Sequence, residues 1–168
     1  MNPNLAFDFT VDKAQKMITI QREFAAAVPL VWNAYTKSDM LDQWWGPKPW
    51  KARTKSMDFR EGGRWLYAMV SPQGEEHWSI ADYSSIKPEQ SYAAWYAFTD
   101  AEGNVNAELP ASDWVVHFSP KGDHTLVEIV ITYAELAHLE TIIKMQFKEG
   151  LAMGMNQLDQ LLAEKQNG

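Results

Sequence analysis

The sequence contains no cysteine, which excludes disulfides, a thiolate nucleophile and any zinc site built on cysteine. It also has no run of 18 apolar residues that would be long enough to span a membrane. Residues 1–5 lack the basic region and apolar stretch of a secretory leader. These absences predict a chain that has no membrane span or anchor and that resides in the cytoplasm.

Positive charge is scarce, because 15 Lys and Arg residues stand against 22 Asp and Glu, giving a net charge of −7. Such a chain repels a phosphate backbone unless its basic residues gather on one face, which argues against a nucleic-acid partner. The histidines His77, His117, His124 and His138 lack metal-ligand spacing, and no HExxH motif occurs. We therefore expect no metal site, and no motif indicates a cofactor.

Aromatic residues are abundant, with eight Trp and seven Phe among 168 residues. A chain of this length fits one hydrophobic core, and that core has to accommodate many large, flat side chains. No repeat, low-complexity tract or linker interrupts the sequence. Residues 1–168 are therefore predicted to form a single domain.

The first third of the chain predicts a strand hairpin followed by two short helices. Alternating apolar residues over 5–9, a polar stretch at 12–16 and apolar residues from 17 to 24 are typical of the hairpin. Pro29 is suited to opening one helix and Ser38 to capping the next, which Gly46 and Pro47 would end.

Residues 50–133 alternate between apolar and polar positions with a period of two, which is typical of an antiparallel meander. Turn residues, among them Gly62 and Gly63, separate the segments, and such short connections favour pairing between sequential neighbours. The predicted strands are 51–59, 64–70, 77–86, 91–99, 114–119 and 125–133.

The C-terminal segment predicts one amphipathic helix of about seven turns and roughly 35 Å, with an apolar stripe that runs from Leu139 to Leu162. Only a concave sheet could cover a helix of that length. The predicted fold is therefore α+β, with a curved antiparallel sheet wrapped around a long C-terminal helix.

A resemblance to a known family rests on residues 22–47, REFAAAVPLVWNAYTKSDMLDQWWGP, and on the later segment Gly62-Gly63-Arg64-Trp65. These segments resemble the family named after the activator of the ninety-kilodalton heat-shock protein's ATPase. That family belongs to the helix-grip, or SRPBCC, superfamily, with the birch-pollen allergen, START lipid-transfer domains and polyketide cyclases. The likeness spans residues 17–163, and residues 5–16 look like an added N-terminal strand. Ala27 and Ser38 depart from the family pattern, which usually has prolines there.

The resemblance implies a cavity between the sheet and the long helix, although proteins of one fold perform unrelated functions. Strand alternation directs one set of large side chains to the concave face, where they either line this cavity or fill a closed core. The Trp44-Trp45 pair either forms a lid over a ligand or has a structural role, with one tryptophan plugging the core and the other half exposed. The candidate ligand-binding residues are Trp44, Trp45, Trp65, Tyr67, Met69, Trp114, Phe118, Tyr133, Phe147, Gly150, Leu151 and Gly154.

Two glycines lie in the middle of the predicted helix, where each should cost roughly 1 kcal/mol relative to alanine. Gly150 and Gly154 are one turn apart on the inward stripe. We expect a void between these glycines and the facing rings, which are those of Trp65, Tyr67, Trp114 and Phe118. Tight packing of those rings over the glycines is the alternative.

Lys51, Arg53 and Lys55 project from one side of a predicted strand. They could receive a carboxylate, a phosphate or an acidic partner surface. The pattern favours the other interpretation, in which charged side chains protect a sheet edge against aggregation.

No motif marks a catalytic residue, since the chain has neither a GxSxG elbow nor a paired Ser, His and Asp. The leading hypothesis is a binding module that sequesters or senses a small, largely apolar ligand, aromatic or lipid-like. The alternative is a partner protein that modulates a chaperone ATPase, although the chain has no room for the extra domain of the eukaryotic activators. A cyclase- or hydrolase-type enzyme, with acid and base groups on scattered strands, is the third hypothesis. The sequence leaves open whether the protein is a monomer or a homodimer.

Overall fold

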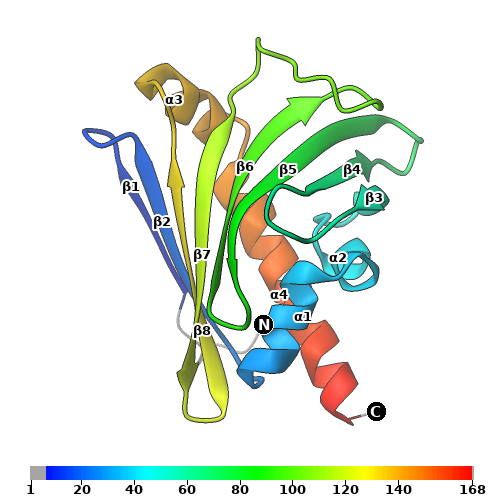
Figure 1. The fold of residues 1–168 in the computed structure, drawn as a ribbon, viewed down its shortest axis with the longest axis vertical. Coiled ribbons are helices and arrows are strands. Elements are labelled where there is room, and N and C mark those ends of the chain that lie inside the picture. Colours follow the sequence, from blue (N-terminus) through cyan, green and yellow to red (C-terminus); the bar gives the residue numbers. More distant parts are fainter. Residues whose placement is uncertain (1–6, 168) are drawn as a thin grey trace.

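The computed structural model describes residues 7–167, in which one antiparallel sheet is combined with four helices (Figure 1). In chain order the elements are β1 (Phe7–Asp12), β2 (Met17–Phe24), α1 (Val28–Thr36), α2 (Ser38–Trp44), β3 (Lys51–Met57), β4 (Arg64–Val70), β5 (Glu76–Lys87), β6 (Ser91–Thr99), β7 (Ser112–Lys121), β8 (His124–Thr132), α3 (Leu136–Lys144) and α4 (Phe147–Asn167). The predicted N-terminal hairpin is present as β1 and β2. Leu5, which the prediction included, lies outside the described residues.

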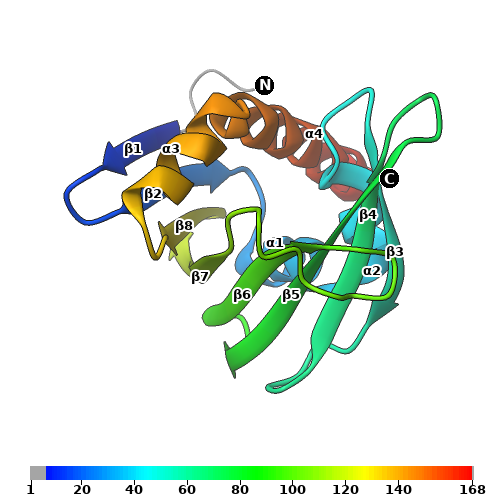
Figure 2. The same cartoon turned by 90° about the horizontal axis from the view of Figure 1, so that it is seen from above.

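The strands follow the order β1-β2-β8-β7-β6-β5-β4-β3, with every neighbouring pair antiparallel. The sheet curves, and α4 runs across its open side, as the view from above shows (Figure 2). This arrangement confirms the predicted helix-grip fold.

The meander from β3 to β8 pairs sequential neighbours, as predicted. The pattern did not indicate the long-range pairing of β2 with β8, in which Met17 lies opposite Thr132 and Phe24 opposite Thr125. The helices α1 and α2 make this pairing possible, because they carry the chain from β2 to the far edge of the sheet (Figure 1).

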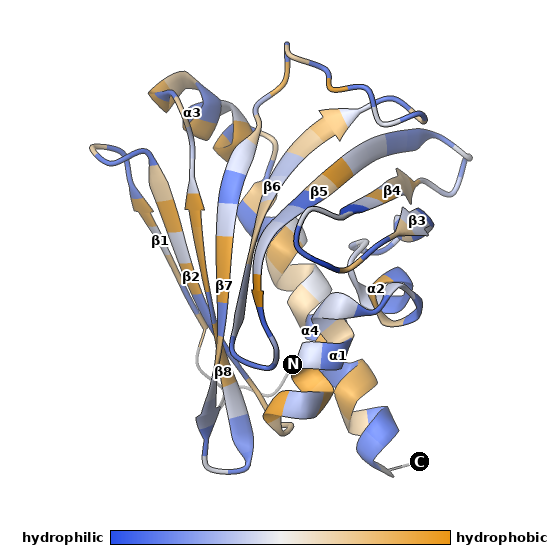
Figure 3. Ribbon diagram, in the orientation of Figure 1, coloured by the Kyte–Doolittle hydropathy of each residue, from blue (hydrophilic) through white to orange (hydrophobic). Residues whose placement is uncertain are grey.

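The strand alternation separates two apolar layers. On the concave side, the aromatic and β-branched residues of β4, β7 and β8 are buried in the main core together with α1, α2 and α4. The intervening residues Leu66, Ile80 and Ala97 form a second, small cluster. Apolar bands along the strands and along α4 follow this division (Figure 3).

The prediction of one continuous C-terminal helix is wrong, because two helices, α3 and α4, meet at Met145 and Gln146. Gln146 adopts a φ of 62°, in the left-handed region, and the Met145 N–H donates to the Thr141 and Ile142 carbonyls. The break changes the direction of the chain (Figure 1), so Leu139 and Ile142 are buried while Ile143 is 39% exposed. Neither glycine nor proline occupies residues 143–148, so the usual sequence signals of a helix end are missing.

The helix starts agree only in part with the sequence. Pro29 lies in the first turn of α1, as predicted. Ser38 does not cap α2, because it is the first helical residue and Lys37 occupies the N-cap position without a side-chain cap hydrogen bond. No helix within residues 7–167 combines the length and the apolarity that crossing a membrane demands.

A buried arginine ties α4 to β2. The Arg22 side chain is 1% exposed, and its Nη1 donates to Asn156 Oδ1 at 3.0 Å. Its Nη2 lies 3.8 Å from Asp159 Oδ2, and its Nε donates to the Glu23 carbonyl at 3.1 Å. Because a buried cation is costly unless it is paired and hydrogen-bonded, these contacts hold the middle of α4 against the sheet.

Replacing Arg22 with alanine should lower the free energy of unfolding by about 3 to 5 kcal/mol, because it leaves Asp159 partly buried without this cation. Urea unfolding measures the change. Arg60→Ala is the control, because the Arg60–Asp58 pair is solvent-exposed and its loss should cost about 0.5 kcal/mol or less. Equal effects of the two substitutions would show that Arg22 does not anchor the helix.

Candidate functional site

A cavity of about 270 Å³ lies between the concave face of the sheet and the start of α4. Residues of α2, of strands β4 to β7, of the α3–α4 junction and of α4 form its walls. All but two of the candidate residues border it: Trp44, Trp45, Tyr67, Met69, Trp114, Tyr133, Phe147, Gly150, Leu151 and Gly154. The structure therefore brings these side chains together around one space.

Trp65 and Phe118 do not border the cavity, although both point to the concave side. Trp65 is buried behind Tyr67, with the two ring centroids 3.9 Å apart, and its indole N–H donates to Thr54 Oγ1 at 3.0 Å. Phe118 packs deeper in the core, 5.1 Å from Trp32 and 5.4 Å from Tyr35 between ring centroids. Strand alternation predicted the correct face of the sheet for both residues, but it did not predict how deeply each side chain is buried.

The two adjacent tryptophans have different roles. Trp44 is 1% exposed and donates its indole N–H to the Ala34 carbonyl at 2.8 Å, so it plugs the core. Trp45 is only half-buried and borders the cavity, where its ring is nearly parallel to that of Tyr96 at a centroid distance of 6.3 Å. One tryptophan thus plugs the core while the other is half-buried, as the structural interpretation predicted, and a lid role for Trp45 stays a prediction.

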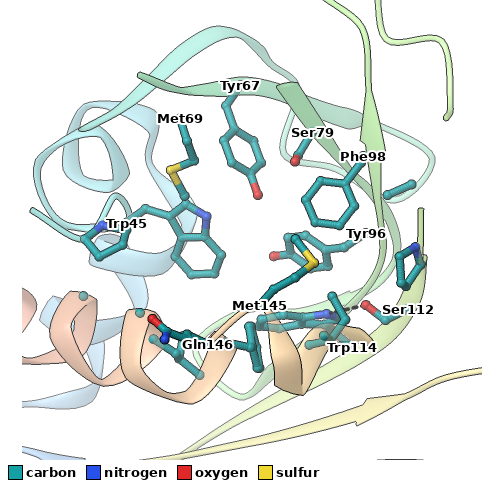
Figure 4. A pocket seen from close by; sticks show the side chains of 18 of the residues that line it. Trp45, Tyr67, Met69, Ser79, Tyr96, Phe98, Ser112, Trp114, Met145 and Gln146 are labelled. Atoms are coloured by element: carbon teal, nitrogen blue, oxygen red, sulfur yellow. Dashed lines mark hydrogen bonds between the residues drawn. The ribbon is translucent and has the colours of Figure 1, made fainter. Parts of the chain in front are cut away.

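Three hydroxyl groups point into the cavity, from Tyr67 on β4, Ser79 on β5 and Tyr96 on β6 (Figure 4). We call these residues the hydroxyl trio. Tyr67 and Ser79 lie directly opposite each other in the β4–β5 register. Ser112 Oγ also borders the cavity, but it accepts the indole N–H of Trp114 at 2.9 Å.

No sequence pattern indicated the remaining lining residues, although strand alternation is consistent with some of them. Tyr96 shares its strand face with Tyr92 and Ala94, which are both buried on the concave side. Others come from loops and from the helix break, where no period applies. The missed residues are Pro47, Ser79, Tyr96, Ala97, Phe98, Pro110, Ser112, Ile142, Met145 and Gln146.

Burial keeps the phenols of the cavity protonated. It raises the pKa of Tyr67 to about 12, against the opposing effect of hydrogen bonding with Trp45 and Ser79. Burial also raises the pKa of Tyr133 to about 12 and that of Tyr96 well above its usual value, where the nearby Tyr92 phenol adds to the effect. A phenol is uncharged at neutral pH even with its usual pKa near 10, and the raised pKa values extend this uncharged, hydrogen-bonding form to higher pH.

Among the described residues, those that line the cavity include no Asp, Glu, His, Lys or Arg. Nor does any group of three or more His, Cys, Asp and Glu within residues 7–167 have the arrangement of a metal site. The chemistry available at these walls is stacking, apolar contact and neutral hydrogen bonding.

The wall that carries Trp45 is fixed by Gln157 of α4. Its amide nitrogen donates to the Trp44 carbonyl at 3.2 Å and to the Gly46 carbonyl at 2.9 Å. Its amide oxygen accepts the Lys48 backbone N–H at 2.8 Å. A single side chain thus satisfies three backbone groups at the end of α2 and in the loop that follows.

The two glycines of α4 differ, so the predicted void is correct for only one of them. A Cβ atom on Gly154 would lie 3.3 Å from the Trp44 carbonyl oxygen, so this glycine permits a close approach to α2. The expectation of a void against the sheet rings is therefore wrong at Gly154. A Cβ on Gly150 would meet only Pro47 Cγ, at 3.7 Å, so space remains there.

The basic residues of β3 lie at one edge of the sheet, as the edge-protection interpretation requires. Arg53 pairs with Glu76, and Lys55 Nζ donates to the Ala101 carbonyl at 2.8 Å. Both cations lie 5.7 Å from the centroid of the Trp78 ring. Neither borders the cavity.

The fold and the site define a helix-grip domain with an apolar cavity between its sheet and its C-terminal helix. Residues 25–163 match the family described as "Activator of Hsp90 ATPase homolog 1-like protein". The chain therefore belongs to that family. The matched range begins after β2, so the β1–β2 hairpin precedes it.

Solved structures share the fold over almost the whole chain. The crystal structure of protein Ms6760 from Mycobacterium smegmatis is 32% identical, with 94% of this chain and 96% of that chain covered and a TM-score of 0.86. An NMR structure of a protein from Arthrobacter aurescens is 25% identical, with coverages of 94% and 91% and a TM-score of 0.88. CalU16 from Micromonospora echinospora, at 20% identity, coverages of 96% and 77% and a TM-score of 0.63, shares the fold alone. The search of curated proteins found no match.

The raised pKa values of the tyrosines predict that the folded protein loses stability at alkaline pH. All six have a raised pKa in the folded protein, with burial as the main cause. The unfolded chain loses these protons near pH 10 whereas the native protein retains them, so the free energy of unfolding should fall as the pH rises from about 10 to about 12. Ultraviolet absorbance of tyrosinate, followed together with circular dichroism, measures both events. Tyrosine ionisation near pH 10 without unfolding would contradict this prediction.

Adding the same side chain at each glycine of α4 should give opposite results. Gly154→Leu should lower the free energy of unfolding by about 1 to 3 kcal/mol, because the leucine collides with the α2 backbone. Gly150→Leu should leave it unchanged or raise it slightly, because the leucine enters open space and favours helix. Thermal unfolding of both variants tests this difference. A stable Gly154→Leu protein would show that the close approach is not tight.

Proposed function

We propose that the protein binds a small, largely apolar ligand, aromatic or lipid-like, in the cavity between the sheet and α4. The observation that carries this proposal is a cavity with aromatic walls, three inward hydroxyls and no charged lining residue among those described. Pockets of this composition are typical sites for small molecules, with a few polar groups that orient the ligand.

The size of the cavity bounds the ligand. An apolar cavity of about 150 Å³ holds one benzene molecule. At about 270 Å³, this cavity has room for roughly eleven non-hydrogen atoms on the same scale. A two-ring aromatic compound meets that bound, and a longer ligand would extend through the mouth past Met145, which is 52% exposed.

The family description names an activator of a chaperone ATPase, so modulation of such an ATPase is the alternative function. An enzyme of the cyclase or hydrolase type ranks third, because the cavity offers protonated phenols in place of a carboxylate or imidazole. Binding a ligand needs only the apolar walls and hydroxyls, and for this reason we rank it first.

Ligand uptake can be measured by intrinsic tryptophan fluorescence, because Trp45 and Trp114 border the cavity. We expect saturable changes with two-ring aromatic compounds. Gly150→Leu should weaken binding at least about tenfold, equivalent to about 1.4 kcal/mol, because its side chain occupies the cavity. Ala163→Leu is the matched control, because it adds similar bulk at an exposed position of α4 away from the lining residues and should bind normally.

A flat fluorescence response to a broad panel of apolar compounds would refute ligand binding. Equal binding by the wild-type and Gly150→Leu proteins would show that the ligand binds outside this cavity. The ATPase rate of the host's own chaperone, measured at saturating protein, decides the alternative function, which an unchanged rate would remove.

A further inference from the structure

We infer, on the basis of the proposed function, that the cavity selects uncharged ligands that carry an oxygen acceptor at one edge of a flat apolar body, and that it excludes the matching carboxylates. Ketones, esters and phenols belong to the accepted class. Fatty acids and aromatic acids in their ionised form belong to the excluded class.

The hydroxyl trio supplies the edge recognition. Tyr67 and Ser79 are opposite residues on adjacent strands, and Tyr96 lies on the next strand along the sheet. Their hydroxyl groups converge on the interior of the cavity (Figure 4). A hydroxyl can both donate and accept, so Tyr67 and Ser79 can share one hydrogen bond and still offer a second donor to a neutral ligand oxygen.

Apolar surfaces surround the trio and fix the orientation of the ligand. The rings of Trp45 and Trp114 lie 6.1 Å apart between centroids, and Phe147 and Leu151 of α4 complete this side of the cavity. Flat aromatic bodies pack well on such rings. A ligand that lies against them directs its polar edge to the trio, because the trio offers the hydroxyls that point into this space (Figure 4).

The lack of a cation in the described cavity lining accounts for the exclusion of carboxylates. A buried carboxylate needs a cation or several strong donors to offset its lost hydration. Arg22 is committed to Asp159 and Asn156, and Arg53 to Glu76 at the sheet edge. Lys148, next to the lining residue Phe147, lies over the Phe9 ring, 5.6 Å from its centroid, and does not border the cavity.

The net charge of −7 acts in the same direction, because it repels anions as they approach. Among the described residues, the cavity lining therefore has no cation, and the long-range field is unfavourable for an acid. A site that holds a carboxylate would need such a cation or several strong donors.

Three probes of nearly equal shape test the inference: 2-acetylnaphthalene, 2-naphthoate and 2-ethylnaphthalene. Titrations at neutral pH are followed by proton–nitrogen NMR, with the indole N–H signals as reporters. We expect the ketone to bind at least about a hundredfold more tightly than the carboxylate. Tyr67→Phe and Ser79→Ala should each weaken ketone binding about three- to tenfold, as expected for one lost neutral hydrogen bond. Neither should change the binding of 2-ethylnaphthalene.

The outcomes separate the inference from the proposed function. Failure of all three probes to bind would overturn the proposed function and the inference with it. Naphthoate binding within about tenfold of the ketone would overturn the inference alone. So would an equal loss of ketone and ethylnaphthalene binding in the variants, because it would show that the trio shapes the cavity without recognising oxygen. Ser79→Ala removes a single half-buried hydroxyl, so it serves as the test if Tyr67→Phe does not fold.

Discussion

The contact between Gln157 and the backbone around Trp44 and Gly46 is the constraint on which the cavity depends. It joins the middle of α4 to the end of α2, and Gly154, one turn earlier, lets the two backbones approach each other. On the sheet side, the Trp45 ring packs against the rings of Trp65, Tyr96 and Trp114, and Asp42 accepts hydrogen bonds from Thr54 of β3. The Gln157 amide and the close approach at Gly154 add the contacts that fix the same wall against α4.

Most of the sheet could be predicted from the sequence, because strand alternation and turn residues act over a few neighbouring residues. The segments with strand-type residues between turn residues located β4 and β6 to the residue. The pairing of β2 with β8 and the break at Gln146 could not be predicted in the same way. The pairing of β2 with β8 joins residues far apart in the chain, and Gln146 carries no local signal for its left-handed φ.

The site was predictable to the same extent as the sheet. Tyr67, Met69 and Trp114 followed from strand alternation, and Gly150 from its cost within a helix. Alternation does not measure depth, so it also selected Trp65, which lies behind Tyr67. The residues of the mouth, such as Met145, come from irregular backbone, where a side chain's direction depends on tertiary structure.

The anchors of α4 are unevenly placed along its axis. Arg22 and Gln157 hold residues 156–159, whereas Phe147 and Leu151, near its start, contribute apolar contacts alone. Apolar contacts are non-directional, so they tolerate small shifts that a hydrogen bond does not. Directional contacts therefore fix α4 beside Trp45, whereas apolar contacts alone hold its start over the mouth. In the binding function that we propose, the mouth is the end of the site that accommodates a longer ligand.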